Sequence, residues 1–91
     1  MRKLPRRDRM KIYGDLLSIL NESKSEKVVL THIQLKMNVP FDRLKVYLIE
    51  LKELELITDE KAPKLTKKGR QYIHEYQSVL DFMKRMGLTY Q

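Results

Sequence analysis

The hydrophobic positions in the first third of the chain follow the spacing of an amphipathic helix. Asp8 is a favourable N-cap, and the hydrophobic residues after it recur at intervals of four, three and one: Ile12, Leu16, Ile19 and Leu20. This pattern predicts a core-facing helix that ends near Asn21. The polar stretch 21–27 then predicts a loop, and the β-branched run Val28 to Leu30 predicts a strand of three residues.

Two more helices are expected in the middle of the chain. Thr31 and Gln34 form a capping-box pattern that predicts a short helix from Thr31 to Met37. Asn38 suits a left-handed C-terminal position, and Pro40 cannot continue the helix. The next helix begins at Pro40 or Phe41 and ends near Glu55, and we expect a buried face at intervals of three, four and three: Phe41, Leu44, Leu48 and Leu51. Two helices joined by such a short turn are typical of a helix-turn-helix.

The last third predicts a short hairpin and a long helix. Residues 56–58 and 64–66 are extended pieces around the charged turn 59–63, and this hairpin can pair with the strand at 28–30. Thr66 caps a helix that runs to about Met86, and Gly87 is placed to end it. The expected order is α-β-α-α-β-β-α, a mainly α fold with a small β-wing, which is the topology of a winged helix-turn-helix.

Residues at the junctions of these elements match a known pattern: Thr31, Ile33, Val39, Leu44, Lys45, Tyr47, Leu48, Leu56, Ile57 and Leu65 to Gly69. They resemble the small archaeal winged-helix family of predicted transcriptional regulators and chromatin proteins, over residues 8 to 80. The resemblance implies a winged helix-turn-helix that binds double-stranded DNA, and several members of that family dimerise through the last helix. Two positions depart from the pattern, because Glu55 replaces a usual glycine and Val46 replaces a common basic residue.

The chain is long enough for one domain, at 91 residues. We expect a basic N-terminal arm at 1–7, the winged helix-turn-helix at 8–70, a C-terminal dimerisation helix at 66–86 and a tail at 87–91. With 42% hydrophobic and 34% charged residues, the composition argues against both a disordered chain and a membrane span. The expected location is cytoplasmic and associated with the nucleoid.

The net charge of +7 is concentrated in two segments. Residues 1–9 carry +4 and residues 59–70 carry +3, whereas residues 42–58 carry −1. Lys and Arg that neutralise phosphates supply most of the sequence-independent affinity for DNA. We therefore expect double-stranded DNA to contact the arm, the wing and the start of the third helix, through Arg6, Arg7, Arg43, Lys45, Val46, Lys61, Lys64, Lys67 and Lys68. A merely solvated charged face is the alternative for any single lysine.

The third helix leaves two interpretations open. Arg43 suits a bidentate contact with guanine, Lys45 a phosphate, and Val46 a thymine methyl group. The predicted outward positions also include the acidic residues Asp42, Glu50 and Glu53, of which Glu50 and Glu53 would face backbone phosphates poorly if the helix entered the groove deeply. Either only the N-terminal end of this helix enters the groove, or the protein is a winged-helix protein-protein interaction module whose contact patch contains Val46 and Ile49. We expect Tyr47 to pack in the core.

Hydrophobic residues along the last helix recur at coiled-coil spacing: Tyr72, Tyr76, Val79, Met83 and Met86. The first helix can cover the beginning of this stripe, around Tyr72, Ile73 and Tyr76, whereas Leu80, Met83 and Met86 are expected to project. This predicts a homodimer with an interface formed by Tyr76, Val79, Leu80, Met83 and Met86. In the alternative, the whole stripe folds back onto the first helix of a monomer.

Candidate catalytic and metal-binding residues are few. The chain has no cysteine, and His32 and His74 have no second histidine at ligand spacing. The three glycines form no phosphate-binding loop, and no Ser, His and Asp have the spacing of a triad. We expect a protein that is not an enzyme and uses no metal, cofactor or small-molecule ligand. Gly69 is expected to permit a close approach to the wing or to a phosphate, or else to be a tolerated packing glycine.

Overall fold

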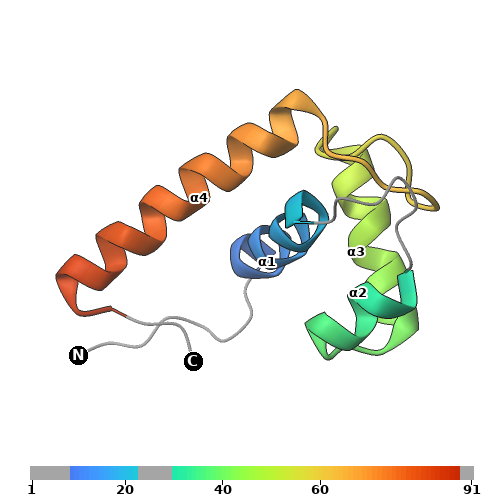
Figure 1. Ribbon diagram of the computed structural model, residues 1–91, viewed down its shortest axis with the longest axis horizontal. Helices are drawn as coiled ribbons and strands as arrows, with labels where there is room; N and C mark the ends of the chain where they lie inside the picture. The colour runs from blue at the N-terminus through green and yellow to red at the C-terminus, as the bar shows by residue number, and fades with distance from the viewer. Residues whose placement is uncertain (1–8, 23–29, 89–91) are drawn as a thin grey trace.

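The computed structural model describes residues 9–22 and 30–88, and in these residues the chain forms four helices (Figure 1). They are α1 (Arg9–Glu22), α2 (Leu30–Met37), α3 (Phe41–Glu53) and α4 (Lys67–Met86). Asp8, Val28 and Val29 lie outside the described residues. Leu30, which we expected in a strand, is the first residue of α2, so that prediction is wrong for this residue.

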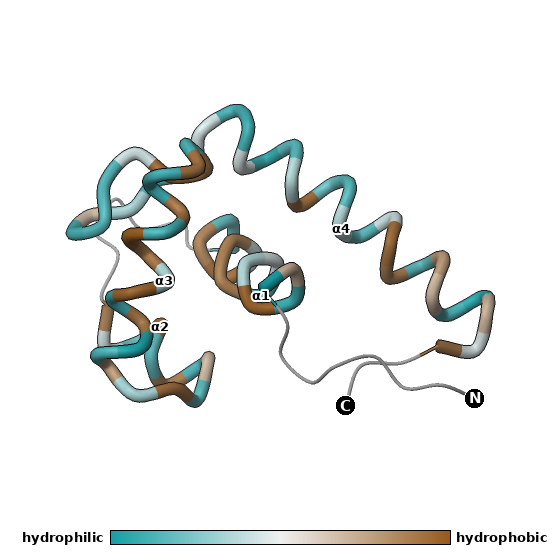
Figure 2. The backbone as a smooth tube through the Cα atoms, turned by 180° about the vertical axis from the view of Figure 1, so that it is seen from behind, coloured by the Kyte–Doolittle hydropathy of each residue, from teal (hydrophilic) through white to brown (hydrophobic). Residues whose placement is uncertain are grey.

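The hydrophobic core is built around α1. This helix contacts α2 and α4, and α2 in turn contacts α3. Figure 2 shows α1 as a largely hydrophobic segment in the middle of the molecule. The fully buried side chains come from all three of the first helices and from the wing: Leu16, Leu17, Ile33, Leu44, Leu48, Leu51 and Pro63. Burial of this apolar surface is the main term that holds so small a domain together.

In α2, α3 and the turn between them, the structure agrees with the predictions at Asn38 and Tyr47 and differs from them at Thr31 and Phe41. Asn38 is left-handed, with φ of 54°, and its N–H donates to the Gln34 carbonyl at 2.9 Å. Thr31 lies inside α2 and does not cap it, because the helix begins one residue earlier. Phe41 is 39% exposed, so its predicted place in the core is wrong, whereas Tyr47 is buried as predicted.

The end of α3 is a Schellman motif. The N–H of Leu56 donates to the Leu51 carbonyl at 2.9 Å, and the N–H of Glu55 donates to the Lys52 carbonyl at 2.9 Å. Glu55 takes the left-handed conformation that this motif requires, with φ of 63°. The helix therefore ends at Glu53 and not at Glu55.

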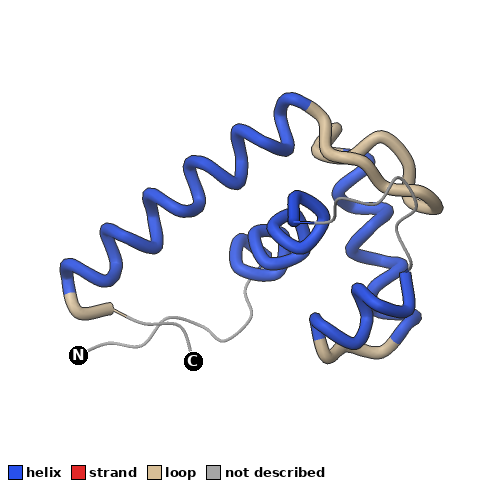
Figure 3. Tube along the Cα trace, in the orientation of Figure 1, coloured by secondary structure: helices blue, strands red, loops and turns tan. Residues whose placement is uncertain are grey.

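The predicted hairpin is reduced to one antiparallel bridge, between Ile57 and Leu65, in the part of the chain that the structure describes. Two further backbone bonds flank it, from Thr58 N–H to the Lys64 carbonyl at 3.0 Å and from Thr66 N–H to the Leu56 carbonyl at 3.2 Å. Figure 3 accordingly draws residues 54–66 as a loop. The wing is thus a closed turn rather than a two-stranded sheet.

Helix α4 has the predicted caps. The Thr66 hydroxyl accepts from the N–H of Gly69 at 3.0 Å, and Gly87 ends the helix with φ of 75°. The helix crosses α1 and extends past it (Figure 1), which gives the molecule extents of 40 × 27 × 23 Å. The Tyr72 hydroxyl fixes the crossing by donating to the Met10 carbonyl at 2.8 Å. None of the described helices is long and apolar enough to span a membrane.

Candidate nucleic-acid interface

The start of α3 presents the side chains that we predicted there. Pro40 precedes the helix with an extended backbone, and its carbonyl accepts from the N–H of Leu44 at 3.0 Å. Arg43, Lys45 and Val46 are all exposed. The ammonium group of Lys45 lies 5.7 Å from the centre of the Phe41 ring. This cation–π contact gives the exposed Phe41 a role at the surface.

The two predicted lysines at the start of α4 have different surroundings. Lys68 donates from Nζ to the Leu54 carbonyl at 2.8 Å, at the C-terminal end of α3. A cation there compensates the partial negative charge of the α3 terminus, so Lys68 joins two elements of the fold. Lys67 is exposed. Of the two, Lys67 is therefore the clearer candidate for a phosphate contact.

Gly69 permits a close approach between α4 and the wing. A β-carbon at this position would overlap the Leu56 carbonyl oxygen. Thr66 reinforces the same junction, because its hydroxyl donates to the Glu55 carbonyl at 2.7 Å. The close approach that we expected at Gly69 is to the wing backbone, and it holds the first turn of α4 against the Leu56 carbonyl.

The wing turn carries Lys61 and Lys64, and both are exposed. Its shape is set by Asp59, whose carboxylate accepts from the N–H of Lys61 at 3.1 Å, a contact that lowers the pKa of Asp59. Glu60 connects the turn to α3 through an ion pair with Lys52 at 3.0 Å, and the hydrogen bond in this pair raises the pKa of Lys52. The turn is thus attached to α3 while its two lysines face solvent.

The outward face of α3 differs from our prediction at one residue. Val46, Ile49 and Glu53 are exposed as expected. Glu50 is half-buried against α1, where it binds Arg9 and Tyr13. A carboxylate that we expected to face a partner is therefore compensated within the fold.

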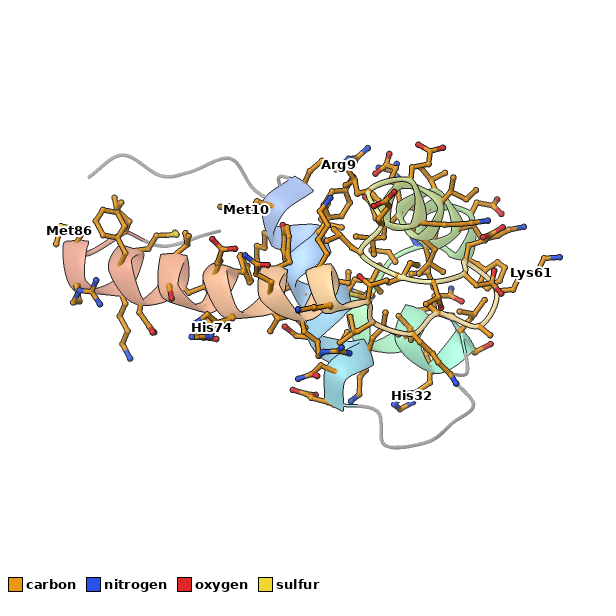
Figure 4. The ribbon with its side chains drawn as sticks, turned by 90° about the horizontal axis from the view of Figure 1, so that it is seen from above. Arg9, Met10, His32, Lys61, His74 and Met86 are labelled. Carbon is orange, nitrogen blue, oxygen red and sulfur yellow. The ribbon has the colours of Figure 1, made fainter. Side chains whose placement is uncertain are left out.

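Arg9 is a residue that our sequence-based set of DNA contacts did not include. It is the first residue of α1, and its side chain is 54% exposed. Figure 4 shows it where the start of α1 adjoins α3, and shows Lys61 at the opposite end of the molecule from Met86. Only the basic composition of residues 1–9 pointed to this region. The predicted contacts Arg6 and Arg7 lie outside the described residues.

The predicted dimer interface on α4 divides into covered and open positions. Tyr76 is buried against Gly14 of α1, and Met83 is only 4% exposed in a single chain. The expectation that Met83 projects from the domain is therefore wrong. Val79 and Leu80 are half-buried, whereas Met86 is 57% exposed. Phe82, which we did not predict at the interface, is 50% exposed.

The described residues contain no cluster of three His, Asp or Glu side chains that could hold a metal ion. His32 and His74 are exposed and lie on different helices, α2 and α4. Five exposed cations lie on the start of α3, the wing turn and the start of α4: Arg43, Lys45, Lys61, Lys64 and Lys67.

A family model described as a winged helix-turn-helix matches residues 6–84, which is most of the chain. No curated protein and no solved structure matches the sequence. The matched region contains all four helices up to residue 84 and the wing turn between α3 and α4.

Proposed function

Because the chain belongs to the winged helix-turn-helix family, a fold that indicates nucleic-acid binding in general, we propose that it binds duplex DNA. The contacts are made by the start of α3, the wing turn and the start of α4. One observation carries this proposal. The five cations Arg43, Lys45, Lys61, Lys64 and Lys67 are all exposed, and none forms an ion pair with another described residue.

Each part of this surface has a physical role in the proposed complex. The start of α3 enters the major groove, where Arg43 binds a guanine and Val46 contacts a thymine methyl group. Lys61, Lys64 and Lys67 bind phosphates, which fixes the register of the protein but carries no sequence information. The compensation of Glu50 by Arg9 removes one of the two acidic groups that would oppose entry of α3.

We further propose that the protein acts as a homodimer, as a transcriptional regulator or a chromatin-associated protein, and not as an enzyme. Phe82 and Met86 are exposed apolar side chains in the C-terminal part of α4. This end of the helix extends past α1 (Figure 1). A second copy that covered them would place two sets of wing and α3 contacts on one duplex. Doubling the contacts supports affinity even though α3 itself carries little net charge.

Titration of a labelled duplex at several salt concentrations tests the proposal. About six phosphate contacts would give a slope of log K against log salt near −5. Lys67→Ala should weaken binding to all sequences alike, whereas Arg43→Ala should also change the sequence preference. Lys84→Ala at the far end of α4 is the matched control and should leave both unchanged. Absence of binding at low salt would overturn the proposal.

The exposure of Val46 and Ile49 on α3 favours a second candidate function. Exposed apolar side chains one helical turn apart suit a protein partner as well as a DNA groove. In this alternative, the fold is a protein-protein interaction module that does not bind DNA directly. Ile49→Lys separates the two: the added cation should maintain or strengthen DNA binding, but it should abolish binding to a protein at this patch.

A further inference from the structure

Four side chains join the start of α1 to α3. The Arg9 guanidinium pairs with the Glu50 carboxylate, with Nε 3.2 Å from Oε1 and Nη2 3.3 Å from Oε2. The Tyr13 hydroxyl donates to the same Oε1 at 2.6 Å. The guanidinium carbon of Arg9 also lies 5.0 Å from the centre of the Tyr47 ring. The carboxylate and the ring therefore fix the orientation of one arginine.

This arrangement does more to orient Arg9 than to stabilise the fold. An exposed ion pair contributes about 0 to 1 kcal/mol. Two nitrogens of the guanidinium face two carboxylate oxygens, and such a fork together with an aromatic ring restricts both the position and the plane of the group. The Arg9 side chain stays 54% exposed, whereas that of Glu50 is 29% exposed. The cation is thus the partner that faces solvent.

We propose that Glu50 is a positioning residue for DNA binding, and that the Arg9 it holds contacts a backbone phosphate beside α3. Arg9 has five N–H donors, and the pair with Glu50 uses two of its nitrogens, so a phosphate can bind at another edge of the group. This inference rests on the proposed function. It gives an acidic residue of α3 a favourable role, through the cation that it orients.

Two substitutions that remove the same charge from the same helix provide the test. Glu53 is exposed and forms no ion pair with a described residue, so Glu53→Ala reports the loss of a negative charge alone. We expect Glu53→Ala to tighten duplex binding about twofold. We expect Glu50→Ala to weaken it about threefold, and to reduce the slope of log K against log salt by about 0.9, the value for one lost phosphate contact.

Arg9 variants show whether Glu50 acts through that residue. Arg9→Ala should reduce the salt slope by the same amount, and Arg9→Lys should reproduce part of the loss because it keeps the charge but not the fork. Glu50→Ala should then cause no further loss in the Arg9→Ala background. Thermal denaturation shows whether each variant is folded at the assay temperature. If the Glu50→Ala variant is unfolded there, the Arg9→Lys variant provides the test.

The outcomes separate this inference from the function on which it rests. If Glu50→Ala tightens binding as Glu53→Ala does, or if the Arg9 variants keep the wild-type salt slope, Glu50 does not position a phosphate contact, while DNA binding itself stands. If the unsubstituted protein does not bind duplex DNA, both proposals are wrong.

Discussion

The ring of Tyr76 on α4 packs directly onto Gly14 of α1, so closely that a β-carbon at residue 14 would overlap the ring. Both residues are buried. Glycine in the middle of a helix costs about 0.5 to 1 kcal/mol relative to alanine. Gly14 therefore favours the close crossing of α1 and α4 at the expense of the intrinsic stability of α1.

Gly14→Ala should destabilise the domain. The gain in helix propensity is about 1 kcal/mol, but forcing a methyl group against a buried ring costs about 1 to 3 kcal/mol. We expect a net loss of about 1 kcal/mol in the free energy of unfolding, measured by urea denaturation. Ser18→Ala on the same helix is the control and should not lower stability. An increase in stability for Gly14→Ala would contradict the crossing geometry.

Glu55→Gly should stabilise the domain. Helices α3 and α4 both end in a residue with positive φ, but that residue is glycine in α4 and glutamate in α3. The left-handed conformation costs a non-glycine residue about 1 to 2 kcal/mol. Replacement by glycine removes this cost, but the greater freedom of glycine in the unfolded chain offsets part of the gain. We expect a gain of about 1 kcal/mol, measured by the same denaturation.

Two controls accompany Glu55→Gly. Glu53→Gly, two residues earlier and inside α3, should lose about 1 kcal/mol because it lowers helix propensity. Asn38→Gly should change little, since asparagine tolerates φ of 54°. A loss of stability in Glu55→Gly would show that residue 55 does not adopt the left-handed conformation in solution.

The elements with local signals were predictable from the sequence. The capping bonds of α4 are local, from Gly69 N–H to the Thr66 hydroxyl and from Gly87 N–H to the Lys84 and Met83 carbonyls, so the capping pattern alone located both ends of this helix. The start of α2 was missed because Leu30 is apolar and β-branched neighbours precede it, a pattern that a strand and a buried helix share. The two-stranded wing was overpredicted, since short extended runs do not show how many bridges they form.

The candidate site was predictable only in part, because its contacts join distant residues. The lysines of the wing and of α4 follow from charge counting along the chain. The partners of Glu50 do not, since Arg9 and Tyr13 lie 41 and 37 residues away and no periodicity connects them. Likewise, the sequence predicts only a surface cation at Lys68. Its hydrogen bond to the Leu54 carbonyl depends on how α4 packs against the end of α3.

Thr66→Ala should destabilise the junction between the wing and α4. The hydroxyl both caps the helix at Gly69 and donates to the Glu55 carbonyl, and loss of an N-cap alone costs about 0.5 to 2 kcal/mol. Thr58→Ala, at an exposed position of the wing, is the control and should change stability by less. If the two substitutions lower the free energy of unfolding equally, the hydrogen bonds of the Thr66 hydroxyl do not stabilise the domain.

Tyr13 should titrate above the ordinary tyrosine pKa of 10.0. Burial and the hydrogen bond to Glu50 raise the pKa of Tyr13 to about 12. The folded state therefore holds this proton more tightly than the unfolded state, so stability falls as the pH rises from about 10 toward 12 and is unaffected at neutral pH. The ultraviolet absorbance of tyrosinate measures this directly, with Tyr13→Phe to identify the signal. Glu50→Gln should lower the pKa of Tyr13, and an unchanged titration would contradict the contact.

The burial of side chains along α4 identifies the residues at which the proposed dimer can be tested. Met83 is 4% exposed in one chain, so a charge there would destabilise the monomer as well as any interface. Phe82 and Met86 are open, and a lysine at Phe82 adds charge without disturbing the core. We expect the unsubstituted protein to sediment at twice the 11.0 kDa chain mass, and Phe82→Lys to release monomers.

Gln77→Lys is the matched control, because it adds the same charge to an exposed position on another side of α4. It should leave the dimer intact, whereas Met86→Lys should weaken it as Phe82→Lys does. The proposed interface is wrong if the unsubstituted protein is a monomer, or if Gln77→Lys and Phe82→Lys have equal effects on the dimer. In that case a single wing and α3 would have to supply the whole DNA affinity, and the salt slope would be correspondingly shallower.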